Sequence, residues 1–137
     1  MTEWTLSFSD RFDYSSFSNV RVPVTLSSSL DKQILIGAQV DTGSTFCIFQ
    51  RVYGDMLGLD TEAGAEQRIE TATGSFTAYG HEVSITAGQL EWEAVVYFAA
   101  PDSFEINVVG RVGFLDRLRV GLVDYEQTVY LGAYRET

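Results

Sequence analysis

Three long stretches of the chain alternate apolar and polar residues with a period of two, over residues 20–26, 34–40 and 90–98. Successive side chains of a β-strand point to opposite faces of a sheet, so this period is typical of strands with one buried face. Shorter runs of the same character predict further strands over residues 4–8, 68–73, 76–86, 105–109, 118–123 and 128–134. The pattern therefore predicts an all-β fold.

Helix is expected in only two places. Residues 51–59 favour a short helix that ends near Gly58, and residues 113–118 favour one short C-terminal helix. The serine-rich run 26–31 predicts a hairpin loop between the first two long strands. Residues 1–19 carry aromatic side chains between polar ones, and we expect them to form an N-terminal arm or an extra edge strand.

The length of 137 residues favours a single domain over residues 1–137. Hydrophobic residues make up 45% of the chain and charged residues 20%, a balance typical of globular proteins. No apolar run approaches the roughly 20 residues of a transmembrane helix, and the start of the chain lacks a basic and hydrophobic leader. The one cysteine, Cys47, is expected to be reduced and buried. We therefore expect a cytoplasmic protein with no membrane partner.

The charge of the chain is strongly acidic, with 9 basic and 19 acidic residues and a net charge of −10. Such a surface repels nucleic acid and anionic membranes, so neither is an expected partner. Two copies of the chain would also repel each other at neutral pH, and protonation of carboxylates would relieve that repulsion.

The leading candidate for chemistry is Asp41-Thr42-Gly43-Ser44, which directly follows the alternating run 34–40. An aspartate here lies at the end of a half-buried strand, in a turn of small residues. Glycine permits a tight turn with backbone close to the carboxylate, and the two hydroxyls can donate hydrogen bonds that hold the turn. The alternative is an aspartate that only caps its own turn.

Two further segments complete the pattern. Residues 68–76 are two strand-like runs around a turn of small residues, typical of a hairpin. The small residues of that turn are Ala72, Thr73, Gly74 and Ser75. Near the C-terminus, Val108-Val109-Gly110 ends an apolar run and is followed by Arg111. A glycine at the end of a buried strand lets the backbone pass close to another segment.

In this order, the Asp41 turn, the hairpin and Val108-Val109-Gly110 resemble the retropepsin-like aspartic proteases, in particular their single-lobe cellular or bacterial members. The resemblance implies an all-β, retropepsin-like acid-protease barrel. It also implies that Asp41 is catalytic and that Thr42, Gly43 and Ser44 support the active-site loop. Residues 72–75 would form a flap over the substrate, with Thr73-Gly74 at its tip, and residues 108–110 would pack behind the site.

The same resemblance implies a homodimer, because one Asp-Thr-Gly supplies half of a catalytic pair. Peptide hydrolysis without a metal or cofactor needs a base that activates water and an acid for the leaving group. Two carboxylates about 3 Å apart share one proton and perform both roles on an extended peptide or protein. Thr42 would contact its counterpart across the dimer axis, and Ser44 would bond the outer carboxylate oxygen. In viral members, an arginine like Arg111 pairs with an acid, but this chain has Thr45 at that position.

Two alternatives remain open at this point. The first is a catalytically inactive module that binds an extended peptide by strand addition. The second is an unrelated β-barrel carrier in which Asp41 is a turn residue. Other chemistries lack the residues they need, because His81 and Cys47 are too few for a zinc site and the chain has no phosphate-binding glycine loop and no Gly-x-Ser-x-Gly elbow. The distance between the two Asp41 carboxylates of a dimer would separate these readings.

Overall fold

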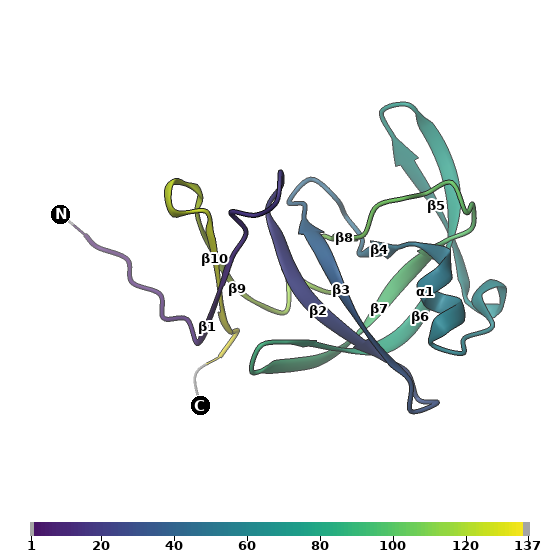
Figure 1. The fold of residues 1–137 in the computed structure, drawn as a ribbon, viewed down its shortest axis with the longest axis horizontal. Helices are drawn as coiled ribbons and strands as arrows, with labels where there is room; N and C mark the ends of the chain where they lie inside the picture. Colours follow the sequence, from purple (N-terminus) through teal and green to yellow (C-terminus); the bar gives the residue numbers. More distant parts are fainter. Residues whose placement is uncertain (1, 136–137) are drawn as a thin grey trace.

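The computed structural model of the chain describes residues 2–135. Its main element is a seven-stranded sheet in the order β2-β3-β8-β4-β7-β6-β5. The strands are β2 (Arg21–Ser27), β3 (Gln33–Val40), β4 (Ile48–Phe49), β5 (Ala65–Thr71), β6 (Gly74–Ala87), β7 (Leu90–Ala99) and β8 (Val108–Val109). An additional pairing of β2 with β6 closes the sheet into a barrel (Figure 1). The predicted all-β fold is confirmed, and the three long alternating runs are all barrel strands.

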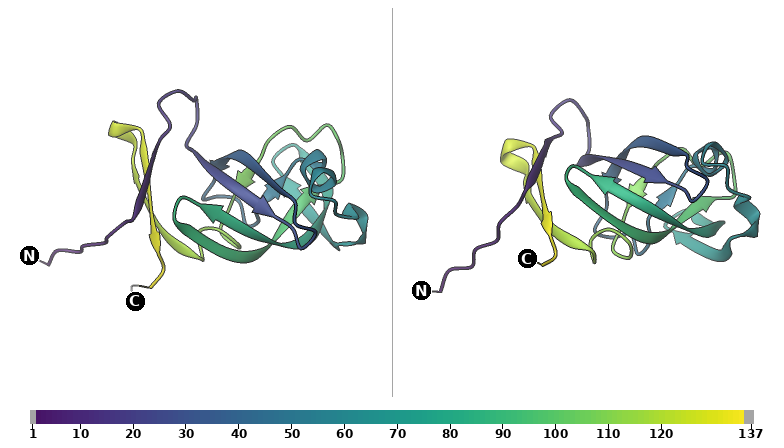
Figure 2. Two further views of the ribbon diagram at one scale, coloured as in Figure 1. Left: turned by 60° about the horizontal axis from the view of Figure 1, so that its bottom comes forward. Right: turned by 90° about the horizontal axis from the view of Figure 1, so that it is seen from below.

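A second, three-stranded sheet lies beside the barrel (Figure 2). It has the order β1-β10-β9 and is antiparallel throughout. Its strands are β1 (Asp10–Asp13), β9 (Leu118–Val123) and β10 (Thr128–Ala133), with a 3₁₀ turn η2 (Asp124–Glu126) before β10. The two C-terminal strands that the sequence predicts therefore form, but outside the barrel.

The N-terminal segment divides into two parts. Residues 10–13 are the extra edge strand β1, which pairs with β10 from Asp10↔Leu131 to Asp13↔Thr128. The strand predicted over residues 4–8 is wrong, because none of these residues belongs to a strand in the described part of the chain. The beginning of this segment leads away from the body of the molecule (Figure 1), whereas the Phe8 ring packs beside Tyr130 of β10, with the ring centroids 5.8 Å apart. The side chain of Trp4 is 91% exposed, so the apolar alternation of this arm does not report burial.

Helical structure is short and only partly where the sequence predicts it. The helix α1 (Arg51–Met56) forms as expected, and a 3₁₀ turn η1 (Thr61–Ala63) follows it. The predicted helix over residues 113–118 is wrong, because residues 113–117 form turns and Leu118 begins β9. Gly113 has a φ of +100°, outside helical geometry. The amide of Leu115 bonds the Gly110 carbonyl, five residues earlier, instead of the i−4 carbonyl of an α-helix.

Two apolar clusters form the core. The larger one fills the barrel, and the inward residues of β2, Val22, Val24 and Leu26, are fully buried in it. The smaller cluster joins buried residues of β4, β5, β6, β7 and β8, with partly buried aromatic residues packed around it. Its buried members are Ile48, Ile69, Ala78, Ala99 and Val108, and its aromatic neighbours are Phe46, Phe76, Tyr97 and Phe104. This second cluster connects the β5–β6 hairpin to the segment that follows Asp41.

Candidate active site

Asp41 begins the turn at the end of β3, and its own turn holds its carboxylate. The backbone N–H of Gly43 donates to Asp41 Oδ1 at 2.9 Å, and the Ser44 N–H donates to the Asp41 carbonyl at 3.2 Å. The Asp41 N–H donates to the Val109 carbonyl of β8 at 3.0 Å. The Asp41 side chain is half-buried. The turn therefore presents a carboxylate whose backbone is tied to a strand from a distant part of the sequence.

That strand, β8, lies between the two strands that flank the turn. It pairs in parallel with β3 through Gln39↔Val108 and Val40↔Val109, and antiparallel with β4 through Ile48↔Val108. The chain thus leaves β3, turns at Asp41, and returns to the sheet on the far side of β8. The predicted strand over residues 105–109 forms only at its last two residues, Val108 and Val109, which pair with β3.

Gly110 makes this crossing possible. A Cβ at position 110 would lie 2.5 Å from the carbonyl oxygens of both Ser44 and Phe46. The residues after it bond the same loop, with the N–H of Arg111 donating to Ser44 O at 2.9 Å and that of Val112 to Thr45 O at 2.8 Å. The close backbone approach expected for Gly110 is present.

Cys47 lies behind the turn and is fully buried. Its sulfur accepts a hydrogen bond from the Gly110 N–H at 3.4 Å and is 3.5 Å from the Val112 carbonyl. Burial raises the pKa of the Cys47 thiol to about 12. The prediction of a buried Cys47 is confirmed, and its polar contacts make it a further tie between the two halves of the crossing.

Asn107 also supports the crossing, although it belongs to no motif of the sequence. Its Oδ1 accepts from the Gln50 N–H and its Nδ2 donates to Gln50 Oε1, both at 3.0 Å. Its carbonyl accepts from the Gln39 N–H at 2.8 Å. One residue thus satisfies groups on both sides of β8. The only sequence signal was a polar residue directly before an apolar pair, which is too common to indicate this role.

The Ser44 hydroxyl bonds a different group from the one that the resemblance implies. In the single chain, Ser44 Oγ donates a hydrogen bond to the Phe46 carbonyl at 2.7 Å and not to the Asp41 carboxylate. Thr42 is exposed and lines an open cavity of about 420 Å³ together with Thr45, Arg111 and Leu115. Within residues 2–135 the Arg111 guanidinium forms no ion pair, consistent with the threonine at position 45.

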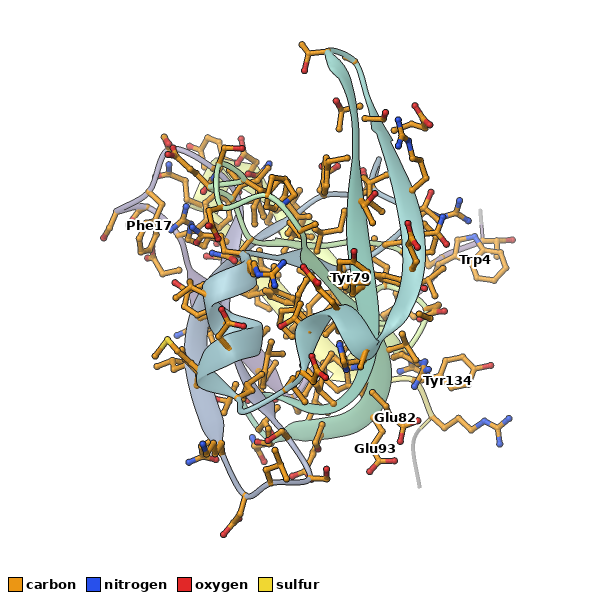
Figure 3. The ribbon with its side chains drawn as sticks, turned by 90° about the vertical axis from the view of Figure 1, so that its right-hand side faces the viewer. Trp4, Phe17, Tyr79, Glu82, Glu93 and Tyr134 are labelled. Atoms are coloured by element: carbon orange, nitrogen blue, oxygen red, sulfur yellow. The ribbon has the colours of Figure 1, made fainter. Side chains whose placement is uncertain are left out.

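The hairpin predicted between the two motifs is formed by β5 and β6. Residues 72 and 73 connect the strands, and Thr71 pairs with Gly74. The Thr71 hydroxyl donates to the Gly74 carbonyl at 2.9 Å. The hairpin rises above the body of the molecule (Figure 3), and the side chains of residues 70–75 are exposed. Ala72-Thr73 is therefore the tip, one residue before the predicted Thr73-Gly74.

A cavity of about 250 Å³ separates the hairpin from the aspartate turn. Gly43, Thr45 and Phe46 line one side of it, and Arg68 and Ile69 of β5 line the other. Gly43 and Ser44 of the predicted turn thus border one space with β5 of the hairpin, whereas Asp41 and residues 72–75 do not line it. Val108 and Val109 are buried behind it, at most 5% exposed.

The remaining candidates for chemistry have structural contacts. His81 Nε2 lies 2.8 Å from the Thr61 carbonyl, so the histidine connects β6 to η1. In the part of the chain that the structure describes, no three His, Cys, Asp or Glu residues are grouped as metal ligands. No helix among residues 2–135 is long and apolar enough to cross a membrane.

A closed β-barrel with an Asp-Thr-Gly turn, crossed by a Val-Val-Gly strand, defines a single-lobe aspartic protease domain of the retropepsin fold. The chain belongs to the aspartyl protease family, whose profile matches residues 22–123. The match begins inside β2 and ends with β9, so β1 and β10 lie outside it. No match is found among curated protein sequences.

Solved structures share the fold. A retropepsin-like aspartic protease from Rickettsia conorii superposes with a TM-score of 0.66 at 15% sequence identity, covering 90% of this chain and 99% of that one. The EIAV protease complexed with the inhibitor HBY-793 superposes with a TM-score of 0.55 at 16% identity, covering 73% of this chain and 88% of that one. At this level of identity, the likeness establishes the fold.

Proposed function

We propose that this protein is a homodimeric aspartic endopeptidase that hydrolyses extended peptides. The observation that carries the proposal is the Asp41 turn, in which a half-buried carboxylate is held by the Gly43 amide and the whole loop is tied to β8. A chain with one such turn supplies one carboxylate, and the chemistry requires two. A second copy is the simplest source of the other.

In the proposed mechanism, the two Asp41 carboxylates lie about 3 Å apart and share one proton. The ionised carboxylate takes a proton from a water molecule as the oxygen attacks the peptide carbonyl carbon. The protonated carboxyl gives its proton to the carbonyl oxygen, and a tetrahedral diol forms. Its collapse breaks the C–N bond, and the leaving nitrogen receives a proton from the pair. No metal or cofactor is required.

The neighbouring residues have distinct proposed roles. Thr42 is exposed beside Asp41 and would contact its counterpart in the partner subunit. Gly43 holds the carboxylate through its N–H. Ser44 would bond the outer carboxylate oxygen only if its hydroxyl turned away from the Phe46 carbonyl on dimerisation or substrate binding. Residues 72–75 would close over the peptide, and the cavity between Phe46 and Ile69 would take one of its apolar side chains.

Asp41→Asn tests the chemistry directly, since an amide of nearly equal size can neither take nor return the proton. We expect cleavage of a diverse peptide library between pH 4 and pH 8 to disappear, with fold and dimer retained. Asp60→Asn is the matched control, because Asp60 is exposed and its side chain caps nothing. Chelators should have no effect on wild-type activity.

The outcomes separate the candidate functions. Equal cleavage by wild type and Asp41→Asn would refute the assignment of Asp41. Silence of both proteins, in a well-formed dimer that binds peptides, would favour the inactive peptide-binding module. Sedimentation tests the dimer itself, which we expect to be tighter at pH 5 than at pH 8, since each chain carries a net charge of −10 at neutral pH. A monomer at both pH values and high concentration would refute it.

A further inference from the structure

A second pocket lies outside the candidate active site, where the N-terminal segment passes over the outer face of β2 and β3. Its volume is about 340 Å³. Phe12 and Phe17 supply aromatic walls, and Pro23 and Gly37, which face each other across the two strands, supply the floor. Two basic residues, Arg11 and Arg21, complete the lining. The pocket thus combines apolar surface with two guanidinium groups.

Arg21 is held in place before any ligand binds. Its guanidinium lies over the Phe17 ring, 4.9 Å from the centroid, and its Nε donates to Asn19 Oδ1 at 3.1 Å. Asn19 is fixed in turn, because its Nδ2 donates to Gln39 Oε1 at 3.1 Å. Figure 3 shows Phe17 on the side of the molecule away from Trp4. These contacts use Arg21 Nε and the face of the Arg21 guanidinium that lies over Phe17. The two terminal nitrogens of Arg21 remain able to donate to another group.

Gly37 keeps the space beside Arg21 open. A Cβ at position 37 would meet Arg21 Cδ at 3.5 Å and Nη1 at 3.7 Å, which is ordinary contact. Position 37 has no positive φ, so a side chain there would be free of backbone strain. The glycine is therefore not required by the strand, and a larger residue would occupy the pocket without removing its charge.

The charges around the pocket favour an anion. Within residues 2–135, neither Arg11 nor Arg21 forms an ion pair. The one acidic residue of the lining, Asp13, accepts a hydrogen bond from the Ser15 N–H at 2.7 Å. The pocket is basic in a chain whose net charge is −10, whereas the outer face of β6 and β7 carries glutamates such as Glu82 and Glu93 (Figure 3).

We propose that this pocket binds a carboxylate carried next to an apolar or aromatic group. Guanidinium forks match the two oxygens of a carboxylate, and the aromatic walls would cover the adjoining apolar group. Gly37 lies four residues before Asp41, about 13 Å along the strand at ~3.3 Å per residue. The pocket is thus separate from the active site but built on the same strand. The carboxylate can come from the C-terminus of a peptide or from a free small acid.

The test is a titration of the isotope-labelled full chain, followed by NMR, with 3-phenylpropionate and with its uncharged amide. The acid should shift the amide signals of Arg21 and Gly37 saturably, and the amide should bind at least about tenfold more weakly. Arg21→Gln should weaken binding of the acid by a similar factor. Lys32→Gln, which removes an equal charge at the β2–β3 turn, should leave it unchanged. Gly37→Val should block binding while keeping both arginines.

Further arms locate the source of the carboxylate and keep the test independent of catalysis. Acetyl-Ala-Ala-Phe with a free C-terminus is titrated into the Asp41→Asn chain, where it cannot be hydrolysed. Tighter binding than 3-phenylpropionate assigns the site to peptide C-termini, and equal or weaker binding assigns it to small acids. Equal affinity for the acid and its amide, or binding unaffected by both Arg21→Gln and Gly37→Val, overturns the proposal. Neither result depends on whether the protein cleaves peptides.

Discussion

The aspartate turn and the β5–β6 hairpin border the same cavity, but they are held in different ways. The turn is bonded by distant backbone, through Asp41 to Val109, Arg111 to Ser44 and Val112 to Thr45. The hairpin tip is held by its own residues, through the Thr71 hydroxyl on Gly74 and the Arg68 guanidinium on Ser75. Residues 70–75 are exposed, whereas the residues behind the turn are buried.

The two regions therefore differ in how readily they can open. Opening of the turn requires that β8 leave the sheet, which is close to global unfolding. Opening of the hairpin tip breaks only local bonds that water can replace, so its free energy is small. A protease needs both properties, because the acid–base groups must keep their geometry while the covering segment admits and releases the peptide. Four measurements test this difference between the turn and the hairpin.

Gly110→Ala should have the largest effect. The added Cβ would overlap the carbonyl oxygens of Ser44 and Phe46, each at 2.5 Å, and both are backbone atoms that cannot turn aside. We expect a loss of more than about 3 kcal/mol in the free energy of unfolding, at the upper end of overpacking effects. Denaturant unfolding measures it. Gly37→Ala is the control, since its Cβ would meet ordinary contacts, and similar losses in both variants would contradict the close crossing.

Asn107→Ala should weaken the same crossing to a smaller extent. It removes two 3.0 Å bonds to Gln50 and leaves the Gln50 N–H without its partner. The expected loss is about 1–3 kcal/mol in the free energy of unfolding. Because the Asn107 carbonyl bond to Gln39 is retained, the fold should persist. Asn19→Ala, which removes an amide on the barrel exterior, is the comparison, and an equal loss there would mean that Asn107 has no special place in the crossing.

Alkaline pH should lower the free energy of unfolding through Cys47, which is buried behind the turn. The pKa of the Cys47 thiol is raised by burial from 9.0 to about 12, so above pH 9 the unfolded chain releases a proton that the folded chain retains. Stability therefore falls as the pH rises from about 9 towards 12, by about 1.4 kcal/mol at pH 10 from this group. Tyr14 acts in the same direction, since desolvation and its bond to Asp124 raise its pKa to about 12.

Unfolding midpoints at pH 8 and pH 10 measure this dependence. Cys47→Ala should show a smaller fall between the two pH values than the wild type, whatever its stability at pH 8. An identical fall in both proteins would remove Cys47 as its source. At neutral pH the same burial should keep Cys47 unreactive toward thiol reagents until the chain unfolds.

Thr71→Ala in the hairpin should have the smallest effect on stability, within about 0.5 kcal/mol, because its bond to Gly74 is exposed. Hydrogen exchange gives the sharper readout. The amides of residues 72–75 should exchange rapidly in wild type and variant, whereas those of Asp41, Arg111 and Val112 should exchange near the rate of global unfolding. Equal protection in the two regions would refute the contrast on which the proposed flap rests.

Local pattern predicted the strands whose burial is regular. β2, β3 and β7 each have one face in the barrel, so their period of two is visible without knowledge of their neighbours. The local pattern gave wrong or no strand predictions for segments that do not pair with a strand next to them in the sequence. The arm around Trp4 alternates but has no strand to pair with, and the two residues of β4 are too short to carry a period.

The helix predicted over residues 113–118 failed for a related reason. The backbone hydrogen bonds of Leu115 to Gly110 and of Asp116 to Arg111 form where this segment leaves the crossing. The local sequence pattern does not indicate these bonds. The turn residues of the hairpin were located within one position, because small residues indicate a turn but the register of the two strands decides which of them connect.

Two residue types at the crossing follow from the sequence, because an aspartate directly after an alternating strand indicates a carboxylate turn, and because only a residue without a side chain lets backbone pass as closely as it does at Gly110. The catalytic role of Asp41 stays a prediction. The neighbours of these residues could not be predicted, because they come from distant parts of the chain. The Asn107–Gln50 pair, the sulfur contact behind the turn and the pocket around Arg21 each join residues that lie far apart along the chain or on opposite strands. Such contacts arise when distant segments pack together, and they leave no period or motif in the sequence.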